Sequence, residues 1–383
     1  MSRKVWIGVS CTIALIVLVA WVMHHHPTSS GEDRIRIGAI LPLTKDAQIL
    51  GTGVREGLEI AVDEINTSGG INGRPIEVLF QDSQNDAREG TSAMRRLIDL
   101  NKVPVVITAM SSVTKAAIPI ADERKVVLFG TVTAEPGLTR SSDWAFRAYY
   151  TTDAQGSVAA EYLTKARLGK VAVLYVKDDY GVSGRDSFQN DLQRHGGQVV
   201  ATEGFDKGAT DIRAQVTNAI AAQPQAVIII SYGETLATAV KRLRELGYRG
   251  CILSYTGLID PDVIAQAGPA AEGALVVASS YDPLAPDTPV QAEFVRRYRE
   301  RFRKPPSHYA AFGHDSLMLL ADAMKRSGTT AQLVRSGLLS GQAQPLVLGS
   351  VSIGPDREVR FPYTVKVLRN GVPVTSLASK PGP

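Results

Sequence analysis

Short apolar runs recur along the chain and predict buried strands. Residues 103–107 and 126–129 are clear examples, because both runs are unalternating and rich in β-branched residues. Runs of this kind are typical of strands that are covered on both faces of a parallel sheet. Further runs with the same character begin at Ile35 and follow along most of the chain.

Longer segments with helical periodicity lie between these runs. The segment 51–73 places apolar residues on one helical face and meets a glycine pair, Gly69 and Gly70, where we expect the helix to end. Strands that alternate with helices predict a mostly parallel, doubly wound α/β sheet. The same rhythm starts again near Ala154, which predicts a second lobe of the same kind.

The predicted lobes do not divide the chain into two simple halves. Residues 281–328 contain strong helical patterns and no obvious strand, so we expect them to cover one of the two sheets. The expected division is residues 34–150 and 281–355 for lobe 1, and residues 151–280 and 356–376 for lobe 2. A ligand cleft between the lobes is then the default binding site.

Length and composition agree with two soluble α/β lobes. At 383 residues the chain is too long for one ordinary core. Residues from Gly31 onward carry 40 basic and 38 acidic groups, which follows from the totals of 42 and 38 once Arg3 and Lys4 are removed. This near-neutral balance, without a strong basic stripe, argues against a nucleic-acid partner.

The first 31 residues have a different character. An uncharged apolar run at residues 5–23 is long enough to span a bilayer as a helix, and Arg3 and Lys4 precede it. By the positive-inside rule, the rest of the chain then lies outside the cytoplasm. The run is longer than the apolar region of an ordinary cleaved signal, so a retained signal anchor in the inner membrane is favoured over a cleaved signal peptide. Residues 24–26, three histidines, are interpreted as a linker and not as a metal site.

Hydroxyl side chains follow two of the predicted strands. Ser111 and Ser112 come after the first of the runs above, and Thr131 and Thr133 come after the second. The carboxyl ends of parallel strands are where open α/β sheets bind ligands. Hydroxyls at these positions also cap helices, so the pattern alone leaves both roles open.

Motifs for catalysis and cofactor binding are missing from the sequence. Residues 112–115 have the S-x-x-K spacing of serine enzymes that react with penicillin, but the companion motifs of those enzymes do not occur. No phosphate-binding loop, nucleophile elbow or zinc-protease motif occurs either. We therefore expect a protein that is not an enzyme and has no cofactor and no metal. Cys11 and Cys251, the two cysteines, provide no disulfide framework.

The order of these segments resembles a known family. From about Arg34 to Val374 the chain is similar to type I periplasmic binding proteins of the branched-chain amino acid group, the extracytoplasmic receptors of ATP-driven importers. The segments that carry the resemblance are "IRIGAILPLT", "GVREGLEIAVDEINTSGGINGRPIEVLFQDSQND", "SSVTKAAIPIADE", "TVTAEPGLT", "WAFRAYYTTDAQG", "KVAVLYVKDDYGVSG" and "YAAFGHDSLMLLADAM". No single segment is specific to the family, but together, in this order, the segments span nearly the whole chain after residue 33.

The resemblance implies a set of ligand-binding residues in lobe 1. Ser111, or Ser112 because the spacing slips by one residue, would hold the carboxylate of the ligand. The carbonyl group of Thr131 and the hydroxyl group of Thr133 would assist. Independently of the family, hydroxyls and free N–H groups at the start of a helix suit an anion.

The resemblance also implies residues in lobe 2, with one departure. Tyr180 and Tyr232 match aromatic residues that close over the ligand. Where amino acid receptors of the group carry an acid for the ligand ammonium, this sequence has Thr256. A closed cleft would leave that ammonium unpaired at a cost of several kcal/mol. Either Glu234 or Asp260 substitutes, or the ligand is an acid or amide without an ammonium group.

The expected function is that of a substrate-binding protein in the periplasm. Leu50, in place of a tyrosine that some members have near the ligand, points weakly away from amino acids. Closure of two lobes over a small carboxylate or amino acid would create the form that the permease subunits of an ABC importer recognise. The alternative is a membrane-anchored sensor of the same fold that signals through a partner protein.

Overall fold

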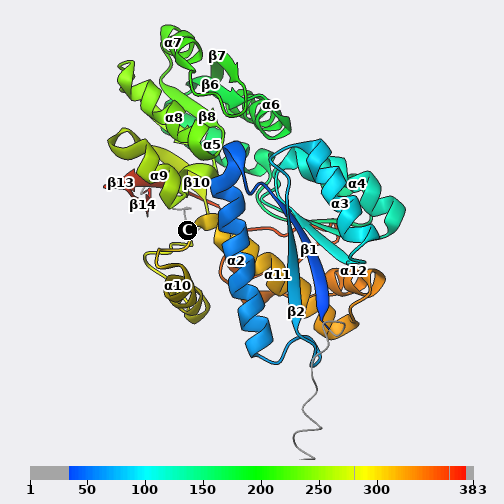
Figure 1. The fold of residues 1–383 in the computed structure, drawn as a ribbon. Coiled ribbons are helices and arrows are strands. Elements are labelled where there is room, and N and C mark those ends of the chain that lie inside the picture. Colours follow the sequence, from blue (N-terminus) through cyan, green and yellow to red (C-terminus); the bar gives the residue numbers. More distant parts are fainter. Residues whose placement is uncertain (1–33, 280, 362, 377–383) are drawn as a thin grey trace, which may run out of the picture.

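The computed structural model describes residues 34–279, 281–361 and 363–376. The apolar run at residues 5–23, predicted as a signal anchor, lies outside the described residues. Among the residues described, none of the helices combines the length and apolarity that crossing a membrane requires. Figure 1 shows two α/β lobes that lie one above the other, and these are the two lobes that the sequence predicted.

Lobe 1 is built on a parallel sheet of five strands. The strands lie side by side in the order β2-β1-β3-β4-β5. Their bounds are β1 Ile35–Leu41, β2 Ile76–Asp82, β3 Val105–Thr108, β4 Val127–Thr131 and β5 Ala145–Ala148. The inner strands β3 and β4 are fully buried, as their unalternating apolar sequences predicted.

Helices cover both faces of this sheet. They are α2 Gln48–Thr67, α3 Ala87–Asp99, α4 Ser111–Arg124, α11 His308–Ser327 and α12 Ala331–Leu339, with short 3₁₀ turns η1 Lys45–Ala47 and η2 Leu138–Ser141. The helices α2 and α11 lie closely against each other (Figure 1). A Cβ atom at Gly57 would lie 1.9 Å from the carbonyl oxygen of Ala310, so glycine is required for this approach. Residues of α11 therefore cover lobe 1.

Lobe 2 is built on a mixed sheet of seven strands. The order is β14-β13-β10-β9-β8-β6-β7. The strands are β6 Lys170–Val176, β7 Gln198–Phe205, β8 Ala226–Ile230, β9 Cys251–Ser254, β10 Leu275–Ala278, β13 Thr364–Arg369 and β14 Val372–Thr375. The last two strands form an antiparallel hairpin that pairs with β10. This hairpin was not among the predicted strands.

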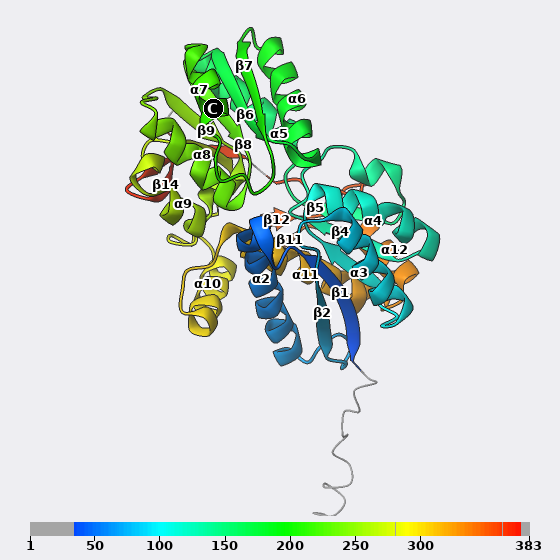
Figure 2. The ribbon, with the colours of Figure 1, turned by 45° about the horizontal axis from the view of Figure 1, so that its top comes forward.

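The remaining elements complete lobe 2 and its surroundings. Lobe 2 carries α5 Thr152–Lys165, α6 Asp179–Arg194, α7 Arg213–Ala221, α8 Gly233–Glu245, η3 Thr256–Ile259, α9 Pro261–Ala267 and η4 Gly268–Ala271. The helix α10 Pro289–Phe302 and the small hairpin of β11 Gln344–Leu346 and β12 Gly349–Val351 lie between β10 and β13 in the sequence. Figure 2 shows α10 beside α2 of lobe 1.

Within the described residues, the chain passes between the lobes three times. The crossings follow β5, β10 and β12, because each is the last strand before the chain enters an element of the other lobe. The two sheets are otherwise separate. Several parallel connections of this kind form a hinge about which the lobes can swing.

Candidate ligand-binding cleft

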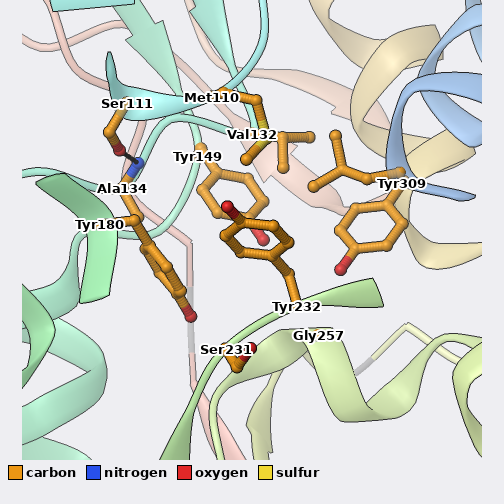
Figure 3. Close-up of a pocket in the computed structure, with 11 residues that line it drawn as sticks. Met110, Ser111, Val132, Ala134, Tyr149, Tyr180, Ser231, Tyr232, Gly257 and Tyr309 are labelled. Carbon is orange, nitrogen blue, oxygen red and sulfur yellow. Dashed lines mark hydrogen bonds between the residues drawn. The ribbon is translucent and has the colours of Figure 1, made fainter. Parts of the chain in front are cut away.

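A cavity lies between the two lobes, at the carboxyl ends of their strands. It encloses about 330 Å³ of space, part of which is open to solvent. Figure 3 shows the side chains around it. The lining residues are Leu50, Met110, Ser111, Val132, Ala134, Tyr149 and Tyr309 from lobe 1 and the crossing after it, and Tyr180, Ser231, Tyr232 and Gly257 from lobe 2.

Ser111 is one of the polar residues that lobe 1 places at the cavity. It is the first residue of α4, and its Oγ accepts hydrogen bonds from the backbone N–H groups of Ala134 at 3.2 Å and Glu135 at 3.1 Å. The hydroxyl proton stays available to donate to a ligand. No side chain in the described part of the chain caps α4. The first-turn N–H groups of any α-helix have no partner within the helix, so those of α4 remain available to a ligand. Ser112 is half-buried and does not line the cavity.

Two residues with unusual backbone conformations lie beside Ser111. Met110 has φ of 72° and Val132 has φ of 47°. The N–H group of Met110 donates to the carbonyl oxygen of Val132 at 3.1 Å, so the two turns are joined. A positive φ is unfavourable for a β-branched residue and is found where the surrounding structure imposes it. Both side chains line the cavity.

Thr131 and Thr133 are buried within lobe 1 and do not line the cavity. The hydroxyl of Thr133 donates to the carbonyl oxygen of Thr131 at 3.2 Å and lies 2.9 Å from the hydroxyl of Thr114. Thr114 in turn lies 2.9 Å from Thr108. This buried chain of hydroxyls holds the turn after β4 against the start of α4. The carbonyl of Thr131 therefore accepts one hydrogen bond within lobe 1.

Tyr232 connects the two lobes. Its hydroxyl donates to Asp178 Oδ2 at 2.6 Å and accepts from the side-chain amide of Asn85, in lobe 1, at 2.9 Å. Burial raises the pKa of Asp178, and the hydrogen bonds from Tyr232 and the N–H group of Gly181 only partly offset this. Burial likewise raises the pKa of Tyr232 well above its ordinary value. Tyr232 therefore stays a hydrogen-bond donor at physiological pH.

Two lysines add contacts across the cleft. Lys115 Nζ lies 2.8 Å from Glu135 in its own lobe and 3.1 Å from Asp179 in lobe 2. Hydrogen bonds to these two acids raise the pKa of Lys115. Lys207, from lobe 2, donates to the carbonyl oxygen of Asn85 at 2.8 Å. The described lobes are thus in contact around the cavity. Lys115 itself is half-exposed, so its pairs contribute little to stability.

The remaining predicted residues of lobe 2 lie away from the cavity. Thr256 is buried, and its hydroxyl is 2.9 Å from Gln155 Oε1 and 3.0 Å from the carbonyl oxygen of Val277. Glu234 is exposed and lines a separate surface depression. Asp260 is fully buried, caps the start of α9, and has its pKa raised to about 7 by burial. None of the three is a lining residue.

Several lining residues were not predicted from the sequence. Tyr149 follows β5 and Tyr309 lies in the first turn of α11. Both residues lie at the cavity because of the tertiary packing of the lobes. Ser231 and Gly257 follow β8 and β9. Their positions at the ends of these strands were the feature of the sequence from which they could have been predicted as site residues. The Oγ of Ser231 is buried and has no hydrogen-bond partner within the described part of the chain.

Comparisons with known proteins agree with this architecture. A model of the periplasmic binding protein family matches residues 34–367. The Leu/Ile/Val-binding protein homolog 2 of Brucella abortus is 28% identical over 378 residues, which cover 97% of each chain.

Two solved structures superpose well on the chain. The leucine-binding protein LivK of Thermotoga maritima has 27% identity and a TM-score of 0.82, with 89% of this chain and 97% of that chain covered. LivJ of Streptococcus pneumoniae, solved with isoleucine, has 26% identity, the same TM-score and the same coverage. The chain belongs to the type I periplasmic binding proteins, in the branched-chain amino acid group of substrate-binding proteins.

Proposed function

We propose that the chain captures a small carboxylate-bearing ligand, an amino acid or a related acid, between its two lobes and delivers it to an ABC importer. The observation that carries this proposal is the cavity at the strand ends of both lobes. Ser111 and the uncapped start of α4 line one side, and the tyrosines of lobe 2 line the other. N–H and hydroxyl donors at the start of a helix suit a carboxylate.

Ligand capture proceeds by closure of the lobes. The carboxylate first docks on lobe 1, where Ser111 donates to it. Lobe 2 then swings in about the three crossings, so that Tyr180 and Tyr232 cover the ligand. Thr131 and Thr133 support this site from below, because their hydrogen bonds hold the turn that carries Val132 and Ala134.

The partners in this proposal are the permease subunits of the importer. The closed arrangement of the lobes is the form they recognise, in the periplasm. The apolar run at residues 5–23 would tether the chain to the inner membrane and raise its concentration near the permease. The family consists of substrate-binding receptors, so we propose no catalytic activity. The relatives are named as binding proteins, and the alternative of a signalling sensor is not favoured.

A binding screen tests the proposal. The purified full chain is heated with amino acids, aliphatic and aromatic acids, amides and sugars, each at millimolar concentration. A ligand present at about 100 times its dissociation constant stabilises the fold by about 2.7 kcal/mol, which a melting curve resolves. Stabilisation by at least one small carboxylate, lost in Ser111→Ala, is the expected result. Stabilisation by none of these compounds would refute the proposal.

A further inference from the structure

The charge of the cavity lining is informative about the ligand. Among the described residues, none of the 11 that line the cavity carries a carboxylate or a cationic side chain. Polar groups come from the hydroxyls of Ser111, Ser231 and the tyrosines other than Tyr232, whose hydroxyl already donates to Asp178, and from the start of α4. The rest of the lining is apolar, with Leu50, Met110 and Val132 among it. The lining therefore offers hydrogen-bond donors to an anion and no counter-charge to a cation.

Five carboxylates lie within three residues of a lining residue along the chain, and none of the five lines the cavity. Glu135 and Asp179 pair with Lys115. Asp178 accepts from Tyr232 and from the N–H group of Gly181. Glu234 is exposed and lines a different depression. Asp260 is buried outside the lining, where its Oδ1 accepts from the N–H group of Asp262 and its Oδ2 has no hydrogen-bond partner among the described residues.

The electrostatic potential at the start of α4 also disfavours an ammonium group in the cavity. The amino end of a helix carries a partial positive charge that favours an anion. Within the described residues, this helix has no side-chain cap, and neither has α8, whereas α3 and α6 are capped by Asp86 and Asp178. The uncapped end therefore leaves its N–H groups free for a ligand.

Ser231 provides an independent indication that a polar group is missing from the cavity. Its side chain is only 1% exposed, and its Oγ has no hydrogen-bond partner among the residues described. Figure 3 shows Ser231 at the lobe 2 side of the cavity, opposite Ser111. A buried hydroxyl without a partner costs free energy, which a bound ligand or water recovers. The hydroxyl can donate or accept a hydrogen bond, but it provides no counter-charge to an ammonium.

We infer that the ligand is a small carboxylic acid with an apolar body and no ammonium group. This inference rests on the proposed function, which needs only a small carboxylate. The carboxylate binds Ser111 and the start of α4. The apolar body lies among the rings of Tyr149, Tyr180 and Tyr309, which pack against aliphatic and aromatic groups alike. A closed cleft without a counter-charge excludes an amino acid because the desolvation of its ammonium is uncompensated.

Matched pairs that differ only in the ammonium group test the inference. Titration calorimetry of the full chain compares leucine with 4-methylpentanoate and phenylalanine with 3-phenylpropanoate, with 4-methylpentanamide as the uncharged control. We expect the acid to bind at least 100-fold more tightly than its amino acid in at least one pair. The pair that binds more tightly identifies the body as aliphatic or aromatic.

Each other outcome has a definite meaning. Equal or tighter binding of an amino acid overturns the inference and leaves the proposed function standing; Asp260→Asn then tests whether Asp260 is the hidden counter-charge. Binding of only the amide also overturns the inference. If neither the pairs nor any compound of the wider screen binds, both the inference and the proposed function fail.

A charge introduced into the lining provides a second test. Ser231→Asp places a carboxylate at the lobe 2 side of the cavity, and Ser231→Asn is the uncharged control of the same shape. We expect leucine to bind at least 10-fold more tightly to S231D than to the wild type, with no such gain in S231N. Equal leucine affinity in two folded variants would count against the inference, and the matched pairs decide it independently if S231D does not fold.

Discussion

The hydroxyl of Tyr232 in lobe 2 accepts a 2.9 Å hydrogen bond from the side-chain amide of Asn85 in lobe 1. The same hydroxyl donates to Asp178 at 2.6 Å, so one side chain joins two elements of lobe 2 to the other lobe. Tyr232 also lines the cavity. The residue that covers the ligand site is therefore also a residue that holds the lobes together.

Tyr232→Phe should shift the unliganded chain toward an open arrangement. The substitution removes the bond across the cleft, and a net hydrogen bond of this kind contributes about 0.5–1.5 kcal/mol. We expect the closed population to fall several-fold and the radius of gyration from small-angle X-ray scattering to increase. Tyr248→Phe is the control, since the hydroxyl of Tyr248 donates to the carbonyl oxygen of Cys251 within lobe 2. An unchanged radius of gyration in Y232F would contradict this prediction.

Ser111→Ala and Ser112→Ala should separate two neighbouring candidates for the carboxylate. Only Ser111 lines the cavity, and it also accepts from two backbone N–H groups. We expect S111A to lose about 1–3 kcal/mol of stability, because those groups are left unpaired, and to lose at least 10-fold in affinity. S112A should retain both properties within about twofold. Calorimetry with 4-methylpentanoate and with leucine provides the affinities, and the reverse order of effects would assign the role to Ser112.

Strands such as β3 and β4 were predictable from sequence because their burial leaves a direct trace in it, but the equally buried β5 and β10 were not among the predicted strands. The runs at 103–107 and 126–129 correspond to β3 and β4, displaced by one or two residues. The hairpin of β13 and β14 was not predicted. Its strands pair antiparallel at the end of the sheet beside β10, and their burial is less uniform than that of β3, β4 or β8.

The orientation of side chains at the strand ends was not predictable in the same way. Ser111, Tyr180 and Tyr232 line the cavity, but Thr131 and Thr133 turn into lobe 1 on either side of Val132. That arrangement depends on the positive φ of Val132. No pattern in the sequence around Val132 predicts this backbone conformation. Tyr309 lies in α11, almost 200 residues after Ser111 in the sequence. Only the tertiary packing of the chain brings it to the cavity.

Val132→Gly should reduce the free energy of unfolding less than the same substitution does at a buried valine with a negative φ. Val132 has φ of 47°, a conformation that glycine adopts without strain and that costs a β-branched residue about 1–3 kcal/mol. Val127→Gly, at a fully buried position within β4, is the control. In urea unfolding, we expect V132G to retain at least 1 kcal/mol more stability than V127G. Equal losses would show that the positive φ of Val132 stores no strain.

The buried His314 should make the stability of the chain depend on pH above neutrality. Its ring lies 2.9 Å from Asp315 and 3.4 Å from Glu64. Burial opposes protonation, but hydrogen bonds to the two acids outweigh it and raise the pKa of His314 to about 9, from an ordinary value of 6.5. Asp315 also accepts from the N–H groups of Val347 and Leu348, so the ion pair anchors the turn between β11 and β12.

The sign of this pH effect follows from the direction of the shift. A group whose pKa is higher in the folded state stabilises the fold fully below its unfolded pKa, and this contribution is lost as the pH rises through the folded pKa. The contribution is therefore complete below about pH 6.5 and disappears by about pH 9 to 10, with a size on the order of 3 kcal/mol. His314→Gln should remove most of the decline in unfolding free energy between pH 6.5 and 9. His195→Gln, at an exposed position, should leave the decline intact. A wild-type chain whose stability stays constant across this range would show that His314 is neutral in the folded protein.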